Sequence, residues 1–245
     1  MDAIILGTGS GLPQADKNLS GLLVRKHDSL VLADCGDGCT KRLLELKIGA
    51  DDLDAIFITH YHPDHVSGLF MLLQWLFLAG RTKALYLFLP ERPAAIIEIM
   101  QLMYTFIQKF KFKLQVLDME QAELYFDWIT TIGTDHLLGY SDIIREHNLS
   151  NQMKSWSVKF TCEAGVLVYS SDIGTTDCIA GFIKGVHTLI VDAGHPEADQ
   201  ILKLKYLDIH RVILTHGISN SLEIRKQELE EGLFLFAKEG HVYRV

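Results

Sequence analysis

The sequence predicts an α/β fold in which short strands alternate with helices. Short apolar runs bounded by Gly, Asp or Pro recur along the chain, as is typical of buried strands. Segments with helical periodicity lie between these runs, which is the pattern of the α/β class. The 245 residues contain no internal repeat and no low-complexity linker. We therefore expect one domain, residues 1–245, built from two comparable halves.

In the first half, the apolar runs predict six strands: Ala3–Leu6, Leu22–Arg25, Leu30–Ala33, Ala55–Thr59, Ala84–Leu89 and Leu114–Leu117. Three helices are predicted between or after them: Thr40–Leu46, Val66–Ala79 and Ala94–Phe110. Val66–Ala79 is the most apolar stretch, but it is shorter than the ~20 residues that span a bilayer. It also contains Gln74, so it predicts a buried helix and no membrane segment.

In the second half, Ser157–Cys162 and Val166–Ser170 flank a short Gly-containing turn and predict a β-hairpin. Two strands and two helices are expected after it: Thr188–Val191, Arg211–Leu214, Glu197–Tyr206 and Leu222–Glu231. The segment 137–155 is polar and poorly periodic, so we expect a surface loop or a short mobile helix there.

The charge balance excludes a protein that coats nucleic acid through its overall field. Lys and Arg number 23 against 31 Asp and Glu, which leaves a net charge of −8. Any phosphate ligand must therefore be held locally. The four cysteines form no C-x-x-C pair, and Met1-Asp2 opens without the basic region of a secretory leader. These features predict a reducing, cytoplasmic setting.

A cluster of potential metal ligands directly follows the predicted strand Ala55–Thr59. Four ligand-type residues fall within six positions: His60, His62, Asp64 and His65. Pro63 keeps a regular helix from absorbing this run, so we expect a tight turn. Imidazoles and a carboxylate on a rigid turn are ligands that Zn²⁺ prefers. A lone histidine would be explained as a solvated loop residue, whereas this grouping favours a metal site.

Three further motifs place ligand-type side chains just beyond strands: His136 in Thr134–His136, Asp172 in Tyr169–Asp172, and His216 in Leu214–Gly217. Together with the first cluster they make five His and two Asp, or seven ligands. Seven are too many for one tetrahedral ion. Two metal ions bridged by Asp172 would use all of them.

At these motifs the sequence resembles the metallo-β-lactamase superfamily, and within it the ribonuclease Z group, which matures the 3′ end of precursor tRNA. The similar segments are Leu6–Pro13 (LGTGSGLP), Lys17–Ser20 (KNLS), Asp34–Cys39 (DCGDGC), Ile56–His65 (IFITHYHPDH), Gly194–His195 and Ile213–His216 (ILTH). The resemblance implies a four-layer αββα sandwich and a hydrolase with two Zn²⁺, or with Mn²⁺ or another divalent ion in their place.

Carried over residue by residue, the resemblance implies one ion on His60, His62 and His136. The second ion would lie on Asp64, His65 and His216, with Asp172 and a water or hydroxide as bridges. Lactamase relatives usually offer Cys where Asp172 stands, and the di-iron redox relatives carry an acidic residue where His62 stands. Both activities are therefore disfavoured.

Two such ions suit hydrolysis of a phosphodiester by a bridging hydroxide, because they activate water and stabilise charge on the attacking and leaving oxygens. The resemblance implies that Asp64 orients the nucleophilic water or accepts its proton. It implies that His195 is the general acid and that Asp192 orients it. The family's His-Glu-Ala-Thr segment and its loop are absent here, however, so His195 alternatively caps the helix that starts near Pro196.

The Gly-rich segment Gly7–Leu12 follows a strand without being a dinucleotide-binding motif, because Leu12 stands where the third Gly is needed. We expect a tight turn at the metal face, with Asn18 and Ser20 near the substrate phosphate. The resemblance makes the segment around Asp34 and Asp37 a turn that supports the site.

Two classes of function stay open. The first is a phosphodiesterase of ribonuclease Z type, acting on precursor tRNA or on a smaller phosphodiester such as a cyclic nucleotide, or a hydrolase of another ester or thioester. The second is a non-catalytic metal-holding protein on the same fold. The family's tRNA-binding arm is predicted to be absent, because 137–155 is neither long nor basic. The resemblance suggests a homodimer, for which Val66–Ala79 is a candidate interface, although burial explains this helix equally well.

Overall fold

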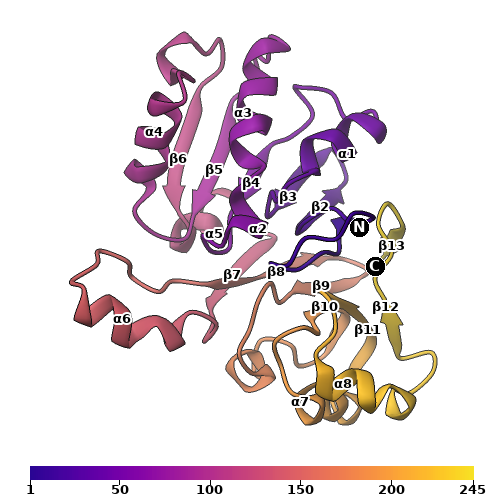
Figure 1. Ribbon diagram of the computed structural model, residues 1–245. Helices are drawn as coiled ribbons and strands as arrows, with labels where there is room; N and C mark the ends of the chain where they lie inside the picture. The colour runs from indigo at the N-terminus through magenta and orange to yellow at the C-terminus, as the bar shows by residue number, and fades with distance from the viewer. The chain divides into compact units, whose positions relative to one another are not determined.

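The structure is a computed structural model that describes residues 1–245, and it divides into two compact units (Figure 1). The first unit comprises residues 1–121 and 238–244, and the second comprises residues 122–237 and 245. Each unit is built on one mixed sheet, in agreement with the predicted α/β class. That the whole chain is a single domain stays a prediction. None of the helices is long and apolar enough to cross a membrane.

The sheet of the first unit has seven strands in the order β13-β1-β2-β3-β4-β5-β6. Their bounds are β1 Asp2–Gly7, β2 Gly21–Lys26, β3 Ser29–Ala33, β4 Ala55–Phe57, β5 Leu85–Leu89, β6 Leu114–Asp118 and β13 Val242–Arg244. Pairing is antiparallel from β13 to β3 and parallel from β3 to β6. The four helices are α1 Cys39–Glu45, α2 Pro63–Val66, α3 Leu69–Leu78 and α4 Pro93–Leu102, and 3₁₀ turns lie at 107–109 and 119–121.

Helices α1, α3 and α4 lie along the sheet of this unit (Figure 1). Alternate residues of β5 (Leu85, Leu87, Leu89) belong to one buried cluster, as the two-residue period of a strand requires. Helix α3 contributes Leu69, Leu72, Leu73 and Leu76 to the same cluster, a spacing that forms one face of a helix. Burial in the core therefore explains most of this apolar segment, while Met71 and Leu78 remain exposed.

Arg81 lies just after α3 and is only 1% exposed. Its side chain links the segments around residues 50–53 and 83–84 through hydrogen bonds. Its guanidinium donates to the carbonyl oxygens of Lys83 (2.7 Å), Leu53 (2.6 Å) and Ala84 (2.7 Å), and also to that of Ala50. Burial lowers the pKa of Arg81. The side chain supplies a donor to the buried carbonyl of Leu53 and to three part-buried carbonyls.

The sheet of the second unit has six strands in the order β12-β11-β10-β9-β8-β7. Their bounds are β7 Ile129–Gly133, β8 Trp156–Cys162, β9 Gly165–Tyr169, β10 Val186–Asp192, β11 Ile209–Thr215 and β12 Phe234–Phe236. The helices are α5 Ala122–Tyr125, α6 Ser141–Glu146, α7 Ala198–Leu202 and α8 Asn220–Ile224, with 3₁₀ turns at 138–140, 176–179, 203–206 and 226–228. The predicted hairpin β8–β9 is confirmed, and β9, β10 and β11 run parallel.

Four predicted segments differ in the structure. Pro63 was expected to keep the histidine motif out of a helix, yet it starts α2, because the first helical position needs no N–H. The helix predicted to Phe110 ends at Leu102, where Tyr104 takes a left-handed φ of 59°. The helices predicted to Tyr206 and Glu231 both break into 3₁₀ turns after one short α-helical segment.

Candidate metal centre

In the first unit, the histidine motif lies at the carboxyl end of β4. His62 caps α2 in an extended conformation (ψ 142°), and Pro63 starts the helix, which places Asp64 and His65 in its first turn. His60 and His65 are fully buried, and Asp64 is only 6% exposed. Buried, ionisable side chains of this kind are rarely found without a partner or a ligand.

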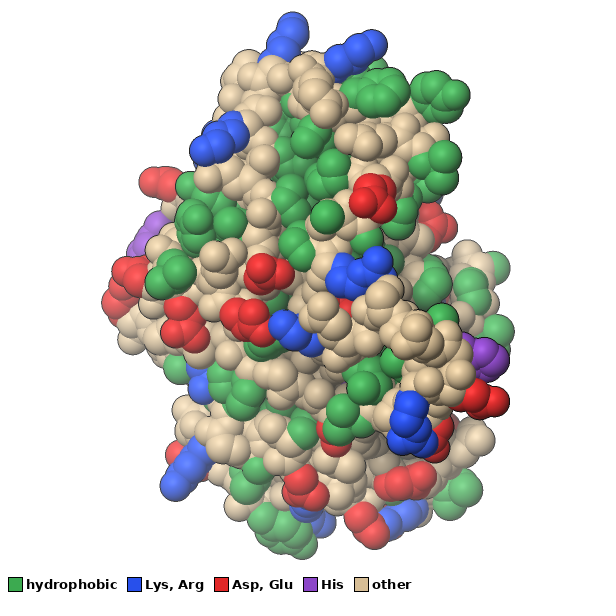
Figure 2. Space-filling model, turned by 90° about the vertical axis from the view of Figure 1, so that its left-hand side faces the viewer, with side chains coloured by type: hydrophobic (Ala, Val, Ile, Leu, Met, Phe, Trp, Pro, Cys, Tyr) green, Lys and Arg blue, Asp and Glu red, His purple; other side chains and the backbone are tan.

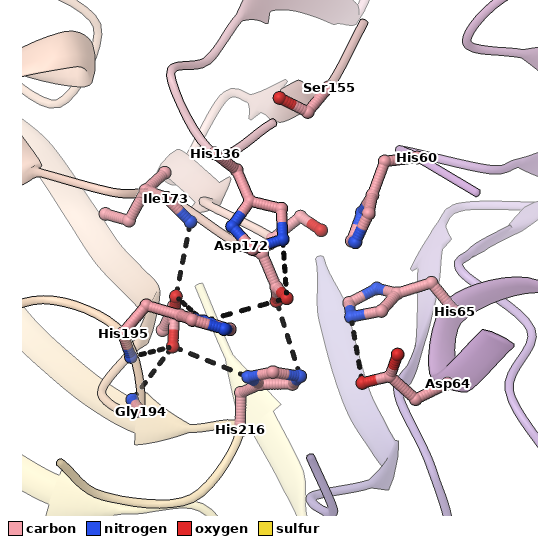
Figure 3. Close-up of polar contacts among 12 residues, drawn as sticks. His60, Asp64, His65, His136, Ser155, Asp172, Ile173, Gly194, His195 and His216 are labelled. Atoms are coloured by element: carbon pink, nitrogen blue, oxygen red, sulfur yellow. Dashed lines mark hydrogen bonds and ion pairs between the residues drawn. The ribbon is translucent and has the colours of Figure 1, made fainter. Parts of the chain in front are cut away.

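The imidazoles of this group lie close together. The ring centroid of His60 is 4.7 Å from that of His62 and 4.1 Å from that of His65. The Nε2 atom of His65 is 3.6 Å from a carboxylate oxygen of Asp64 (Figure 3). The first unit thus brings together the four ligand-type residues that the sequence places there.

Asp34 fixes the orientation of His65 by accepting a hydrogen bond from its Nδ1 atom. Strands β3 and β4 run parallel, so the residues that follow them meet at one edge of the sheet. The buried Asp34 carboxylate accepts hydrogen bonds from the backbone N–H of Thr59 (2.8 Å), from its hydroxyl (2.9 Å) and from Nδ1 of His65 (2.8 Å). With its proton on Nδ1, His65 keeps the Nε2 lone pair for a metal ion. The predicted supporting role of this segment therefore has a specific contact.

Close backbone contact also supports this turn. A Cβ atom built on Gly36 would lie 2.2 Å from the carbonyl oxygen of Asp64, and one built on Gly68 would lie 2.2 Å from that of Gly36. The backbone N–H of Cys35 donates to the carbonyl oxygen of His65 (2.8 Å). Only glycine allows these backbone approaches. The DCGDG segment therefore packs directly against the backbone of the histidine turn and supports it.

In the second unit, the carboxylate of Asp172 lies between two imidazoles. Its Oδ2 atom is 3.5 Å from Nε2 of His136, and its Oδ1 atom is 3.5 Å from Nε2 of His216 (Figure 3). All three side chains are at most 7% exposed. Each oxygen of the carboxylate thus faces a different nitrogen.

These spacings fit metal ligands better than hydrogen bonds. Two ligands of a tetrahedral zinc ion, each about 2.0–2.1 Å from the metal, lie about 3.3 Å apart. The two nitrogen–oxygen distances of 3.5 Å are close to that value and longer than an ordinary hydrogen bond. The donor set of nitrogens and carboxylate oxygens also suits a borderline divalent cation. The residues of this unit therefore fit a metal ion.

Asp192 orients two histidines at once. Strands β9, β10 and β11 are parallel, so Asp172, Asp192 and His216 all follow or end strands at the same edge. The Asp192 carboxylate accepts a hydrogen bond from Nδ1 of His195 (2.9 Å) and lies 3.5 Å from Nδ1 of His216. The backbone N–H groups of Gly194 (2.8 Å) and His195 (3.2 Å) also donate to it.

The charges in this group shift its pKa values in opposite directions. Burial alone would raise the pKa of Asp192, but the hydrogen bond from His195 and the nearby imidazole of His216 outweigh it and hold that pKa well below the usual range. The hydrogen bond to Asp192 raises the pKa of His195, with burial opposing. His195 is 41% exposed, in contrast to His136 and His216. The histidine whose pKa is raised is therefore also the accessible one.

Three residues in the segments that carry or support the ligand candidates have a strained backbone. Asp34, Ser171 and His216 adopt left-handed conformations with φ of 61°, 51° and 62°, which are uncommon for residues other than glycine. Each lies in a segment that carries or supports a ligand-type side chain. Such strain is typical of functional sites, where the surrounding contacts outweigh its cost.

Asp135 was not singled out from the sequence. Its carboxylate accepts hydrogen bonds from the backbone N–H of Gly174 (2.7 Å) and the hydroxyl of Thr175 (2.8 Å), and so ties the loop after Asp172 to the residue before His136. Its position beside a histidine is the only local signal that marks it. The amide of Asn18 donates to Glu239 (2.8 Å) and to the carbonyl oxygen of Leu6 (3.2 Å), and its position near the substrate phosphate stays a prediction.

Comparison with known proteins identifies the relatives of this chain. A family model described as anti-Pycsar protein Apyc1 matches residues 1–177. The ribonuclease Z of Myxococcus xanthus is 31% identical over 144 residues, a region that covers 56% of this chain and 45% of the relative. The chain thus spans about half the length of the curated relatives it matches.

Two solved structures share the fold. The metallo-β-lactamase fold protein YhfI from Bacillus subtilis has a TM-score of 0.75 at 21% identity, covering 99% of this chain and 98% of the other. The short form of human tRNase Z has a TM-score of 0.75 at 20% identity, covering 100% and 99%. The chain therefore has the metallo-β-lactamase fold of these structures, and it belongs to the family of the anti-Pycsar protein Apyc1.

Proposed function

We propose that this protein is a metal-dependent phosphodiesterase that holds two divalent ions, with Zn²⁺ as the first candidate and Mn²⁺ as an alternative. The observation that carries the proposal is the carboxylate of Asp172, whose two oxygens face His136 and His216 at 3.5 Å each. A carboxylate with one oxygen toward each of two imidazoles would be able to offer one oxygen to each of two ions.

The ligand assignment follows from the family resemblance. One ion would be held by His60, His62 and His136, and the other by Asp64, His65 and His216. Asp172 would be shared between them. The burial of Asp172 and the orientation of His65 by Asp34 support this assignment. When bound, such ions lower the pKa of water and stabilise negative charge on phosphate oxygens.

The protein's own side chains supply the proton transfers. Asp64 would orient the attacking water or accept its proton. His195 would protonate the leaving alcohol, since the hydrogen bond to Asp192 raises the pKa of its imidazole and fixes its orientation. The alternative role of His195 as a helix cap has less support, because its Nδ1 atom is engaged with Asp192.

The substrate we favour is a small phosphodiester such as a cyclic nucleotide. Between His136 and Asp172, the chain outside β8 and β9 contains only α6 and a 3₁₀ turn. The charges of residues 137–155 balance, with Asp142 paired to Arg145 (2.6 Å). Such a segment lacks the positive charge with which proteins grip an RNA backbone. Precursor tRNA is the second candidate, because the curated relatives are named ribonuclease Z.

The protein is further proposed to act as a homodimer in the cytoplasm. Apolar side chains are exposed on α3 and at the end of α4 and just beyond it (Met71, Leu78, Leu102, Met103 and Tyr104). Figure 2 shows hydrophobic surface over the upper part of the molecule. The four cysteines are all free, as suits a reducing compartment. Sedimentation at micromolar concentration tests the dimer, and a single monomeric species would contradict it.

The test of the function is hydrolysis of bis(4-nitrophenyl) phosphate with and without a chelator, together with elemental analysis. We expect two metal ions per chain and hydrolysis that stops on chelation and returns with Zn²⁺ or Mn²⁺. Bound metal without turnover of phosphodiesters, carboxylic esters or thioesters would favour a non-catalytic protein. Cleavage of a precursor tRNA in preference to cyclic nucleotides would favour the second substrate.

A further inference from the structure

One side chain from the C-terminal segment closes the loop that follows β1. Glu239, only 14% exposed, accepts hydrogen bonds on Oε1 from the backbone N–H groups of Thr8 (3.1 Å) and Asn18 (2.9 Å). Its Oε2 atom accepts from the side-chain amide of Asn18 (2.8 Å) and from the guanidinium of Arg42 (3.1 Å). Thr8 and Asn18 flank the loop 9–17, so a single carboxylate holds both of its ends.

The loop closed in this way lies beside the metal-ligand candidate Asp64. A Cβ atom built on Gly11 would lie 3.8 Å from one carboxylate oxygen of Asp64 and 3.9 Å from the other, which is van der Waals contact. Residues 11–16 are all exposed. The next residue after Gly11 is Leu12, whose side chain is 78% exposed. An apolar side chain therefore stands in solvent one residue from the contact with Asp64.

An exposed leucine by itself is ordinary. Here the position matters, because a phosphodiester whose phosphate lies at Asp64 must extend its organic group away from the metal ligands. Leu12, one residue from the contact with Asp64, offers an aliphatic surface to the flat face of a base. A loop fixed at both ends also loses less conformational freedom when it binds a ligand.

We propose that loop 9–17 is the element that contacts the nucleoside of the substrate, that Leu12 packs against its base, and that Glu239 is the positioning residue that holds the loop in place. This inference rests on the proposed phosphodiesterase function. Its parts come from opposite ends of the chain, since Thr8 and Glu239 are 231 residues apart.

The test compares two substrates that differ only in the base: 3′,5′-cyclic AMP and the corresponding base-free ribose 3′,5′-cyclic phosphate, both followed by phosphorus NMR. In Leu12→Ala and in Glu239→Gln we expect the KM for cyclic AMP to rise about tenfold, as the loss of an apolar contact predicts, while kcat changes less than about twofold. The KM for the base-free substrate should stay unchanged.

Matched controls separate positioning from stability. Glu45→Gln removes the other carboxylate that pairs with Arg42 (2.8 Å) without touching the loop, and Leu44→Ala truncates a half-exposed leucine of α1. Both should behave as the unmodified protein. Because Leu12 is exposed, Leu12→Ala keeps the test valid if Glu239→Gln folds poorly.

The outcomes distinguish this inference from the function on which it rests. If the unmodified protein hydrolyses neither these substrates nor bis(4-nitrophenyl) phosphate, the proposed function fails and the inference fails with it. If it hydrolyses only bis(4-nitrophenyl) phosphate, the inference alone is wrong. If it hydrolyses both, but the variants change the two KM values equally or not at all, the inference alone is wrong. A lower Tm for Glu239→Gln with both KM values unchanged would also overturn it.

Discussion

Replacing Asp34 by Asn tests whether hydrogen bonding from behind His65 prepares it as a metal ligand. The Asp34 carboxylate accepts from Nδ1 of His65 at 2.8 Å and from Thr59 at 2.8 and 2.9 Å. An Asn side chain can still accept from Thr59 through its oxygen, but its NH₂ group then faces His65. The imidazole must turn its lone pair to Nδ1 and its proton to Nε2, where the metal should bind. Asn also tolerates the left-handed φ of 61°, so the backbone is spared.

The expected loss follows from the role of this contact. Removal of the partner that orients a ligating histidine typically weakens metal binding about 10- to 100-fold, or about 1.4–2.8 kcal/mol. We expect Asp34→Asn to retain about one ion per chain after dialysis against a chelator that leaves two in the unmodified protein. The loss of charged hydrogen bonds should also lower the free energy of unfolding by about 1.5–3 kcal/mol.

The assay is a competition titration of the metal-free protein against a chromophoric chelator, with urea unfolding in parallel. Asp37→Asn is the matched control, because Asp37 lies in the same DCGDG segment and is exposed. It should bind metal as the unmodified protein does. If Asp34→Asn keeps both ions at unchanged affinity, Asp34 does not prepare His65 for metal, and the reasoning is refuted.

Three further predictions concern single side chains. His195→Ala should lower phosphodiester turnover about 10²- to 10⁴-fold with metal content unchanged. In the unmodified protein, activity should fall as the pH rises through the raised pKa of His195, because the donated proton is then lost. The same fall in the activity of His195→Ala at alkaline pH would contradict this. Arg81→Met leaves the buried carbonyl of Leu53 and three part-buried carbonyls without their donor and should cost about 1.5–3 kcal/mol of unfolding free energy in urea; a change below about 1 kcal/mol would be inconsistent with it. Burial raises the pKa of Cys178 to about 12, so iodoacetamide at pH 8 should leave Cys178 unmodified by mass spectrometry until the protein is denatured; labelling of the folded protein would count against it.

Local patterns predicted the strands that carry the site. Apolar runs bounded by Gly or Asp predicted β1 to β6 within two residues at each end, because these strands are short and all but β6 are largely buried. The histidine motif was visible for the same reason, since its ligand-type residues are neighbours in sequence. The helices were predicted too long where a left-handed residue such as Tyr104 ends them, a conformation that helical periodicity does not reveal.

Contacts between residues that are far apart in the sequence could not be predicted from it. Asp34 reaches His65 across 31 positions, and Glu239 reaches Thr8 across 231. Both depend on strand order, which places β3 beside β4 and β13 beside β1. No local pattern carries that information, so the partners of these carboxylates could be identified only once the sheet was known.

The measurement closest to the central claim is a titration of metal-free protein with Zn²⁺ while phosphodiester hydrolysis is followed. A site in which Asp172 is shared by two ions predicts little activity at one equivalent and full activity at two. The Asp172→Asn variant should not hydrolyse the phosphodiester at any Zn²⁺ concentration at which the unmodified protein is active. Full activity at one equivalent, or an active Asp172→Asn variant, would contradict the two-metal account.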